Sequence, residues 1–246
     1  MIETDFAGAV ARITIANDRK LNSLGSPLLE ALARAFGDVP REARVVVLTG
    51  EGTRAFIGGA DITEMARIAS PDDARAFITR IHHVCRAIRD CPQPVIARVN
   101  GWCLGAGLEI AAACDMRVAA TTAHFGMPET RVGMPSVVEA ALLPGLIGWG
   151  RARRLMYLGD TIGALEAERW GLVERVAQDL DAAVIEWCDM LLACGPESLH
   201  RQKALMRIWE DSTMTAAINA GIDAFAATWE SEEPRRMTAA FTQRKR

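Results

Sequence analysis

The sequence predicts an α/β fold with a helical C-terminal region, and two observations lead to this prediction. Between residues 6 and 119, strand-like segments alternate with helix-like segments, as in a layout with parallel strands. Beyond residue 150, all but one of the periodic segments are helical. We therefore expect an α/β core over residues 1–190 and a helical region over residues 191–246.

Four segments in the first half have the patterns of strands. Residues 6–16 alternate apolar and polar side chains, as a strand with one buried face does. Residues 45–48 form a continuous apolar run rich in valine, which is typical of a strand buried on both faces. Residues 94–99 and 115–119 are the two further strands that we expect.

Serine and proline mark where the helices of this half begin. The dipeptide Ser26-Pro27 opens the first helix, with the serine as its N-cap and the proline in its first turn. The segment that starts at Ser70-Pro71 opens the second helix, which ends before residue 91. A third helix begins near Gly105.

The second half consists mainly of helices. We expect them over residues 151–158, 163–170, 180–194, 197–209, 213–229 and 233–244, with an extended segment at 172–176. The last helices carry large apolar side chains that need a partner, either within this chain or on another subunit. These side chains are Leu199, Met206, Trp209, Ile218, Ile222, Phe225 and Trp229.

Composition excludes several classes of protein. The chain has 28 basic and 31 acidic residues, so its formal charge of −3 gives no positive field for nucleic acid. Its six cysteines show neither a CxxC pair nor a zinc-like spacing, which favours reduced thiols in a cytoplasmic protein. The N-terminus lacks the pattern of a targeting signal, and the longest apolar runs are too short to span a membrane.

Two glycine-rich segments are the strongest functional signal. Residues 55–62 read Ala-Phe-Ile-Gly-Gly-Ala-Asp-Ile, and residues 100–109 read Asn-Gly-Trp-Cys-Leu-Gly-Ala-Gly-Leu-Glu. Each has the pattern of a strand or loop that leads into a helix, where backbone N–H groups are free to meet an anion. Two such groups from separate loops suit a carbonyl oxygen that becomes negative during a reaction. A dinucleotide site fits poorly because position 110 is isoleucine.

Two glutamates accompany these segments. Glu109 lies three residues after Ala106, on the same face of the predicted helix and among apolar neighbours. Burial there raises a carboxyl pKa toward neutral pH, which suits proton transfer, although a salt bridge to an arginine such as Arg117 is the structural alternative. Glu129 follows Pro128 in a loop, where it is either a second catalytic acid or an exposed acid.

In this order and at these spacings, the segments resemble the crotonase superfamily, also called the enoyl-CoA hydratase/isomerase family. The resemblance covers almost the whole chain. It also includes residues 45–50, 94–101, 114–119, 158–160 and 167–173. It implies a crotonase-like spiral of ββα units with a helical tail that packs in homotrimers, often paired as homohexamers.

The resemblance also assigns roles to residues. It implies that the N–H groups of Ala60 and Ala106 form the oxyanion hole, that Glu109 positions and deprotonates water, and that Glu129 exchanges the proton of the α carbon. It implies a substrate site that includes Gly59, Asp61, Ile62 and Gly105. It implies CoA phosphate contacts from Lys20, Arg54 and Arg244. The methionines Met65, Met127 and Met134 suit either an acyl pocket or the core.

Having both glutamates favours an enoyl-CoA hydratase, a hydro-lyase that adds water reversibly across the 2,3 double bond. CoA would arrive as part of the substrate, and we expect no metal and no redox cofactor. The alternatives are an enoyl-CoA isomerase or an acyl-CoA hydrolase or lyase on the same fold. A non-catalytic binding subunit is a further alternative, which two intact glutamates disfavour.

Residues 133–142 depart from the family pattern. Hydratases of the family usually have a glycine-rich run there, whereas this chain reads Gly-Met-Pro-Ser-Val-Val-Glu-Ala-Ala-Leu and is about one residue shorter. Ser136 and Val137 stand near the position where some relatives have a catalytic aspartate, which argues against those chemistries. Glu139 has two open interpretations. It is either a third acid of the site or a first-turn helix acid that follows Ser136 as N-cap.

Overall fold

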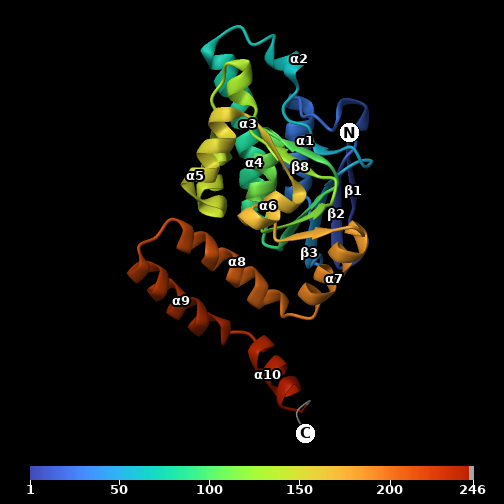
Figure 1. The fold of residues 1–246 in the computed structure, drawn as a ribbon. Coiled ribbons are helices and arrows are strands. Elements are labelled where there is room, and N and C mark those ends of the chain that lie inside the picture. The colour runs from blue at the N-terminus through green and yellow to red at the C-terminus, as the bar shows by residue number, and fades with distance from the viewer. Residues whose placement is uncertain (244–246) are drawn as a thin grey trace.

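Two β-sheets lie at the centre of the structure, a computed structural model that describes residues 1–243 (Figure 1). The larger sheet has the strand order β1-β2-β3-β5-β7-β10, and the smaller has the order β4-β6-β8-β9. The larger sheet contains β1 (Ile2–Asp5), β2 (Val10–Ile15), β3 (Val45–Gly50), β5 (Val95–Val99), β7 (Met116–Ala120) and β10 (Arg175–Ala177). The smaller contains β4 (Ala55–Ile57), β6 (Trp102–Leu104), β8 (His124–Gly126) and β9 (Thr161–Gly163).

The parallel arrangement expected from the alternation of elements is confirmed. From β2 to β10, every neighbouring pair in the larger sheet is parallel, and only β1 pairs antiparallel with β2. Strand β1 and the smaller sheet were not predicted. The strands of the smaller sheet have three residues each, which is too few to show a period, and they pair only with segments distant in the chain.

Helices cover both faces of the larger sheet. On one face, Val46 and Leu48 of β3 belong to the main core, which α1 (Ser26–Gly37), α3 (Pro71–Asp90) and α4 (Ala106–Ala113) complete. On the other face, Val45 and Val47 pack in a second core with α7 (Leu180–Leu192). Because side chains alternate across a strand, a continuous valine run serves both cores.

The helix start signals were right at one helix and wrong at another. Ser70 caps α3, because its hydroxyl oxygen accepts a hydrogen bond of 3.1 Å from the Asp73 N–H. Ser26 is not a cap, since α1 begins at Ser26 and its N-cap is Gly25. Both the N–H and the hydroxyl of Ser26 bind the carboxylate of Glu64 instead, a partner that no local pattern indicates.

The remaining helices connect the sheets and form the C-terminal region. They are η1 (Asp18–Lys20), α2 (Ile62–Met65), η2 (Glu129–Val132), η3 (Val138–Leu142), α5 (Leu143–Leu158), α6 (Ala164–Trp170), α8 (Pro196–Glu210), α9 (Met214–Thr228) and α10 (Glu233–Gln243). In the described part of the chain, no helix has the length and the apolar character to cross a bilayer. Five of the six cysteines are buried, and all six are unbridged.

Helices α8, α9 and α10 gather at one end of the molecule (Figure 1). Helix α8 is tied to the core by the buried Lys203, whose Nζ donates to Ile88 O at 3.1 Å, Gln93 O at 3.0 Å and Asp115 Oδ2 at 2.7 Å. Helix α9 packs beside α8 but leaves side chains such as Ile222 and Phe225 exposed. These apolar residues therefore find no cover within residues 1–243, and the division at residue 190 stays a prediction.

Candidate active site

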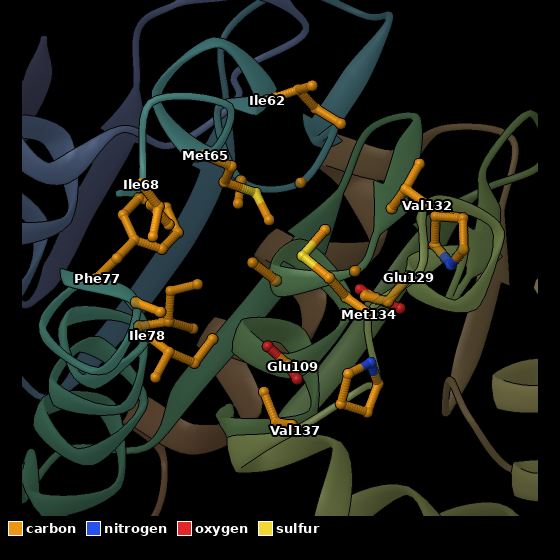
Figure 2. A pocket seen from close by; sticks show the side chains of 18 of the residues that line it. Ile62, Met65, Ile68, Phe77, Ile78, Glu109, Glu129, Val132, Met134 and Val137 are labelled. Atoms are coloured by element: carbon orange, nitrogen blue, oxygen red, sulfur yellow. The ribbon is translucent and has the colours of Figure 1, made fainter. Parts of the chain in front are cut away.

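A cavity of about 510 Å³ brings both glycine-rich segments together with both predicted glutamates. Figure 2 shows the carboxyl groups of Glu109 and Glu129 beside the cavity, with the apolar side chains of Ile62, Ile68 and Phe77 around it. The apolar side chains that line the cavity include Ile62, Met65, Ile68, Pro71, Phe77, Ile78, Ile81, Leu104, Val132, Met134 and Val137. Met65 and Met134 thus line the cavity, whereas Met127 is buried in the core.

Two backbone amides border this cavity without an acceptor among the described residues. At the first segment, Leu24 N donates to Gly59 O at 2.9 Å and Asp61 N donates to Leu24 O at 2.9 Å, which leaves the N–H of Ala60 between them unused. At the second segment, Ala106 is the first residue of α4, so its N–H has no partner within the helix. Ala60 and Ala106 both line the cavity.

Neighbouring atoms lie so close to the backbone of Gly105 and Gly107 that a side chain would not fit at either position. A Cβ on Gly105 would lie 2.4 Å from Glu129 Oε1, and the φ of Gly105 is 51°. A Cβ on Gly107 would lie 2.3 Å from the carbonyl oxygen of Ile57, where α4 packs against β4. Glycine at 105 therefore makes room for the Glu129 carboxyl, and glycine at 107 brings the start of α4 close to the first segment.

Glu109 is almost completely buried. Only 3% of its surface is exposed, and every residue of α4 is buried with it. Burial, and after it the nearby charge of Glu129, raises the pKa of its carboxyl to about 8, although the backbone N–H groups of Ala140 and Val137 act in the opposite direction. The salt-bridge alternative is wrong, because Arg117 pairs with Glu174 and donates to backbone carbonyls instead.

Glu129 reaches the same cavity from a different setting. It begins the short helix η2, is half-buried, and accepts a hydrogen bond of 2.9 Å at Oε2 from the hydroxyl of Ser136. The alternative of an exposed loop acid is thus wrong. The predicted N-cap role of Ser136 is also wrong, since the N-cap of η3 is Val137 and the Ser136 hydroxyl donates to Glu129 instead.

The other predicted substrate-binding residues divide into two groups. Gly59, Ile62 and Gly105 line the cavity together with the glutamates. Asp61 and Lys20 do not line it, because their side chains pair with each other at 2.9 Å. Asp61 also caps α2 by accepting from the N–H of Thr63 at 2.8 Å, and the bond to Lys20 lowers the pKa of its carboxyl.

The predicted phosphate contacts lie outside the cavity. Arg54 pairs with the Asp18 carboxylate at 3.0 Å and has a half-exposed side chain. Arg244 lies outside the described residues. The sequence did not indicate the cations that do line the cavity, Arg75 on α3 and Arg131 on η2. Surface arginines are common at such positions, so no local pattern separates these two from the others.

The sequence also did not indicate a contact between α3 and η3. His82 Nδ1 lies 2.8 Å from Glu139 Oε1. Glu139 is buried and lies in the first turn of η3, as one of its two interpretations expected, and it is not among the residues that line the cavity. The two residues are 57 positions apart in the chain, so only the folded structure shows the pair. Among the described residues, no group of three or more potential ligands is arranged to hold a metal ion.

The known proteins that this chain is similar to include several enoyl-CoA hydratases. The short-chain-enoyl-CoA hydratase of Clostridium acetobutylicum is 32% identical over 244 residues, which cover 97% of this chain and 93% of that protein. The crotonyl-CoA hydratase of Syntrophomonas wolfei is 32% identical over 96% of this chain and 93% of that protein. The crystal structure of an enoyl-CoA hydratase from Bacillus anthracis superposes with a TM-score of 0.94 at 32% identity, covering 99% and 96% of the two chains.

The profile of the enoyl-CoA hydratase/isomerase family matches residues 5–246, nearly the whole length of the sequence. The resemblance first drawn from the glycine segments and the glutamates is thereby confirmed, as is the crotonase-like α/β fold. On the extent of these matches, the chain belongs to the enoyl-CoA hydratase/isomerase family, the crotonase superfamily.

Proposed function

We propose that this protein is an enoyl-CoA hydratase, which adds water reversibly across the 2,3 double bond of an enoyl-CoA thioester. The observation that carries the proposal is that two glutamates and two unused backbone amides share one largely apolar cavity. The names of the two hydratase relatives support the same activity. An acid, a base and an oxyanion site are the groups that this addition requires.

The amides of Ala60 and Ala106 would stabilise the thioester oxygen. When water adds at the β carbon, electron density moves to this carbonyl oxygen and the intermediate becomes enolate-like. Two fixed N–H donors meet that charge without reorganising, and the N-terminus of α4 adds its dipole. Removal of one such donor in an enzyme typically costs about 3 to 4 kcal/mol of transition-state stabilisation.

The two carboxyl groups would work as a pair that holds one proton. In the empty site burial keeps that proton on Glu109. A water molecule bound between the carboxyls lets the proton pass to Glu129, so that Glu109 becomes the base. Glu109 then takes a proton from the water as its oxygen bonds to the β carbon, and Glu129 delivers its proton to the α carbon. The proton on Glu109 balances the one that Glu129 lost.

The substrate would enter with its acyl chain on the apolar side of the cavity. Ile62, Met65, Ile68, Phe77 and Ile78 provide that side (Figure 2). Addition of water moves protons but no net electrons, so the proposed reaction needs no redox cofactor. The two amides and two carboxyl groups would supply the charge stabilisation and proton transfer without a metal, and CoA acts only as part of the substrate.

Lys20 and Arg54 stay candidates for the CoA phosphates. Both cations are largely exposed, but each already pairs with an aspartate. A phosphate would therefore have to share or replace that partner. Exposed ion pairs are worth only about 0 to 1 kcal/mol, so a doubly charged phosphate can compete for them.

The exposed apolar face of α9 supports assembly into homotrimers or homohexamers. Ile218, Ile222 and Phe225 lie on successive turns of this helix, and each is more than half exposed. Light scattering after size exclusion would give the subunit number, and a monomer would contradict the proposal. We also propose that the protein is cytoplasmic and serves fatty acid metabolism, in line with its expected substrate.

The direct test is loss of the absorbance of the conjugated enoyl thioester when the purified protein meets crotonyl-CoA and a longer 2-enoyl-CoA. A 3-enoyl-CoA and an assay for free thiol, run in parallel, would detect isomerase and hydrolase activity. Hydration of the 2-enoyl substrate is the expected result. A folded protein that turns over only the 3-enoyl substrate, or releases CoA, would contradict the hydratase proposal.

A further inference from the structure

Helix α3 carries four arginines, and Arg75 differs from the other three. Each of the other three pairs with a carboxylate of the described chain, at 2.5 to 3.2 Å: Arg80 with Glu30, Arg86 with Asp90 and Arg89 with Glu210. Among residues 1–243, no carboxylate pairs with Arg75, and Asp73, half a turn before it, bonds to the hydroxyl of Ser70 instead. Of the four arginines, Arg75 alone lines the cavity of the candidate active site.

Arg75 stands where the α3 wall of this cavity reaches solvent. The residues of α3 that line the cavity lie on one helical face, at spacings of three and four: Pro71, Ala74, Arg75, Phe77, Ile78 and Ile81. Ile81 is buried, Ile78 is half-buried and Arg75 is exposed. The wall therefore opens toward the N-terminal end of α3, and about 9 Å of helix separates its buried end at Ile81 from the arginine.

This wall belongs to the side of the cavity that we propose for the acyl chain. Figure 2 shows Phe77 and Ile78 on it, with Val132 on the opposite side of the cavity. In the proposed reaction the two amides hold the thioester oxygen and the two glutamates flank the α and β carbons. The acyl group beyond the β carbon then lies against the apolar side chains of α3. An acyl group that continues along this wall toward solvent ends beside Arg75.

The second cation of the cavity lining is held more firmly than Arg75. Arg131 Nε donates to Leu158 O at 3.0 Å, and a Cβ added to Gly159 would lie 3.0 Å from Arg131 Cγ. The stem of Arg131 is thus packed against the end of α5. The side chain of Arg75 forms no such bond in the part of the chain that the structure describes, so its planar fork of N–H donors is available to a ligand.

We propose that Arg75 binds a carboxylate at the far end of the acyl group, so that the preferred substrates are 2-enoyl-CoA thioesters whose acyl chain ends in a carboxylate. The proposal rests on the proposed hydratase function and adds a substrate class to it. A guanidinium matches the two oxygens of a carboxylate with two parallel hydrogen bonds. An apolar cavity alone disfavours a charged tail. A cation at its solvent end lets the apolar part of the chain be buried while the carboxylate stays paired and near water.

The phosphates of CoA are the other anion that a cation near this cavity could bind. They follow the thioester sulfur, on the opposite side of the carbonyl carbon from the β carbon. Lys20 and Arg54, which precede the first glycine-rich segment in the chain, are the candidates for that end of the substrate. Arg75 instead shares a helical face with Ile78 on the acyl side. A tail carboxylate is therefore the better match for Arg75.

The test uses pairs of substrates that differ only in the last carbon of the acyl chain. Hex-2-enoyl-CoA ends in a methyl group, and 5-carboxypent-2-enoyl-CoA has a carboxylate carbon in its place. Pent-2-enoyl-CoA and 4-carboxybut-2-enoyl-CoA form the corresponding five-carbon pair. Wild type is compared with Arg75→Met, which keeps an unbranched stem and removes the charge. Arg86→Met is the matched control, because Arg86 is exposed on the same helix and does not line the cavity.

The first readout is kcat/KM for hydration of each substrate. The second is calorimetric titration with the saturated six-carbon thioesters, hexanoyl-CoA and 5-carboxypentanoyl-CoA, which reports binding without turnover. Wild type should prefer the carboxylate-ended substrate in at least one pair. Arg75→Met should lower kcat/KM for that substrate by about 10-fold to 100-fold, the range of a charge-assisted hydrogen bond. It should keep the wild-type rate with the methyl-ended partner, and Arg86→Met should match wild type on both.

Two results would overturn the proposal. Equal losses with both members of a pair in Arg75→Met would mean that Arg75 contacts the CoA part of the substrate. A wild type that prefers the methyl-ended member of both pairs would mean that the cavity selects neutral chains. If wild type hydrates no substrate, the hydratase function fails, and the titration alone decides the role of Arg75. Tighter binding of the carboxylate-ended thioester that Arg75→Met abolishes would then support that role, and equal binding of both thioesters would refute it.

Discussion

Glu109 and Glu129 are chemically identical residues that face one cavity from two unlike settings. Glu109 lies in the first turn of α4, a helix whose residues are all buried, and its pKa is raised to about 8 by burial. Glu129 lies in the short helix η2, is half-buried, and receives a hydrogen bond from Ser136. A hydrogen bond of this kind favours a charged carboxylate, whereas burial favours a neutral acid. The difference shows how burial can keep the single proton of the pair on Glu109 at rest, before the proposed transfer through bound water to Glu129.

Removal of the carboxyl groups one at a time tests whether both glutamates are needed for the reaction. Glu109→Gln and Glu129→Gln should each lower kcat for hydration of crotonyl-CoA by about 10²-fold to 10⁴-fold, because each removes a group that transfers a proton in the transition state. KM should change less, since glutamine has nearly the same shape. Steady-state rates from the absorbance of the enoyl thioester would measure both parameters.

A surface acid provides the control for these variants. Glu186 pairs with Arg175 at 2.8 Å and is not among the residues that line the cavity, so Glu186→Gln should keep wild-type rates. If Glu129→Gln retained most of its hydration activity, the proposed division of labour would fail. If Glu109→Gln kept turnover of a 3-enoyl-CoA and Glu129→Gln lost it, a single-base reaction such as isomerisation would become the better proposal.

A second prediction concerns stability and pH, and it tests the burial of Glu109. Its pKa is about 8 in the folded chain against an ordinary value of 4.5, so the folded state binds more protons than the unfolded state between these values. The stability that the neutral acid provides is full below the unfolded pKa and is lost as the pH rises through the folded pKa. The total loss is at most about 5 kcal/mol.

Urea unfolding of wild type and Glu109→Gln would measure this loss. The glutamine variant cannot ionise, so its unfolding free energy relative to wild type should increase from about pH 5 to about pH 9. Subtraction of the two curves removes the contributions of all other titrating groups that the variants share. A constant difference over this window would mean that Glu109 is not in a low-dielectric setting.

The contrast between the two glutamates also shows what the sequence could predict. The setting of Glu109 was predictable because local signals agree: glycines before it, an apolar helix around it and an alanine-rich continuation. The settings of Glu129 and Glu139 could not be predicted. Their hydrogen-bond partners, Ser136 and His82, come close to them only when the chain has folded. The smaller sheet escaped prediction for the same reason, since its strands are too short to carry a period.

A third prediction tests the close approach between Gly105 and Glu129. In Gly105→Ala the new Cβ would meet Glu129 Oε1 at 2.4 Å, so the carboxyl must move away from the second glycine segment. The backbone of Gly105, with a φ of 51° and a ψ of −121°, lies outside the left-handed helical region, so alanine adds strain of about 1 to 3 kcal/mol there. Because a displacement of about 1 Å can cost about 10²-fold in rate, kcat/KM should fall by roughly this factor.

The control for Gly105→Ala is Gly171→Ala, which also places alanine at a positive φ but makes no contact with the site. Gly171 has a φ of 81°, and the nearest atom to its added Cβ would be a carbonyl oxygen at 3.5 Å. This variant should lower the melting temperature and leave kcat/KM unchanged. Equal losses of activity in both variants would show that strain alone, and not the position of Glu129, limits the reaction.

The smallest expected effect comes from Ser136, whose hydroxyl donates to Glu129 Oε2 at 2.9 Å. Ser136→Ala removes this bond, worth about 1 kcal/mol, so kcat should fall roughly fivefold while stability changes little. Ser136→Thr keeps the hydroxyl and should restore most of the rate. If alanine and threonine variants both match wild type, Gly105 and the backbone of η2 already fix the Glu129 carboxyl. The half-exposed glutamate would then be positioned by the fold of its turn, just as Glu109 is positioned by its helix.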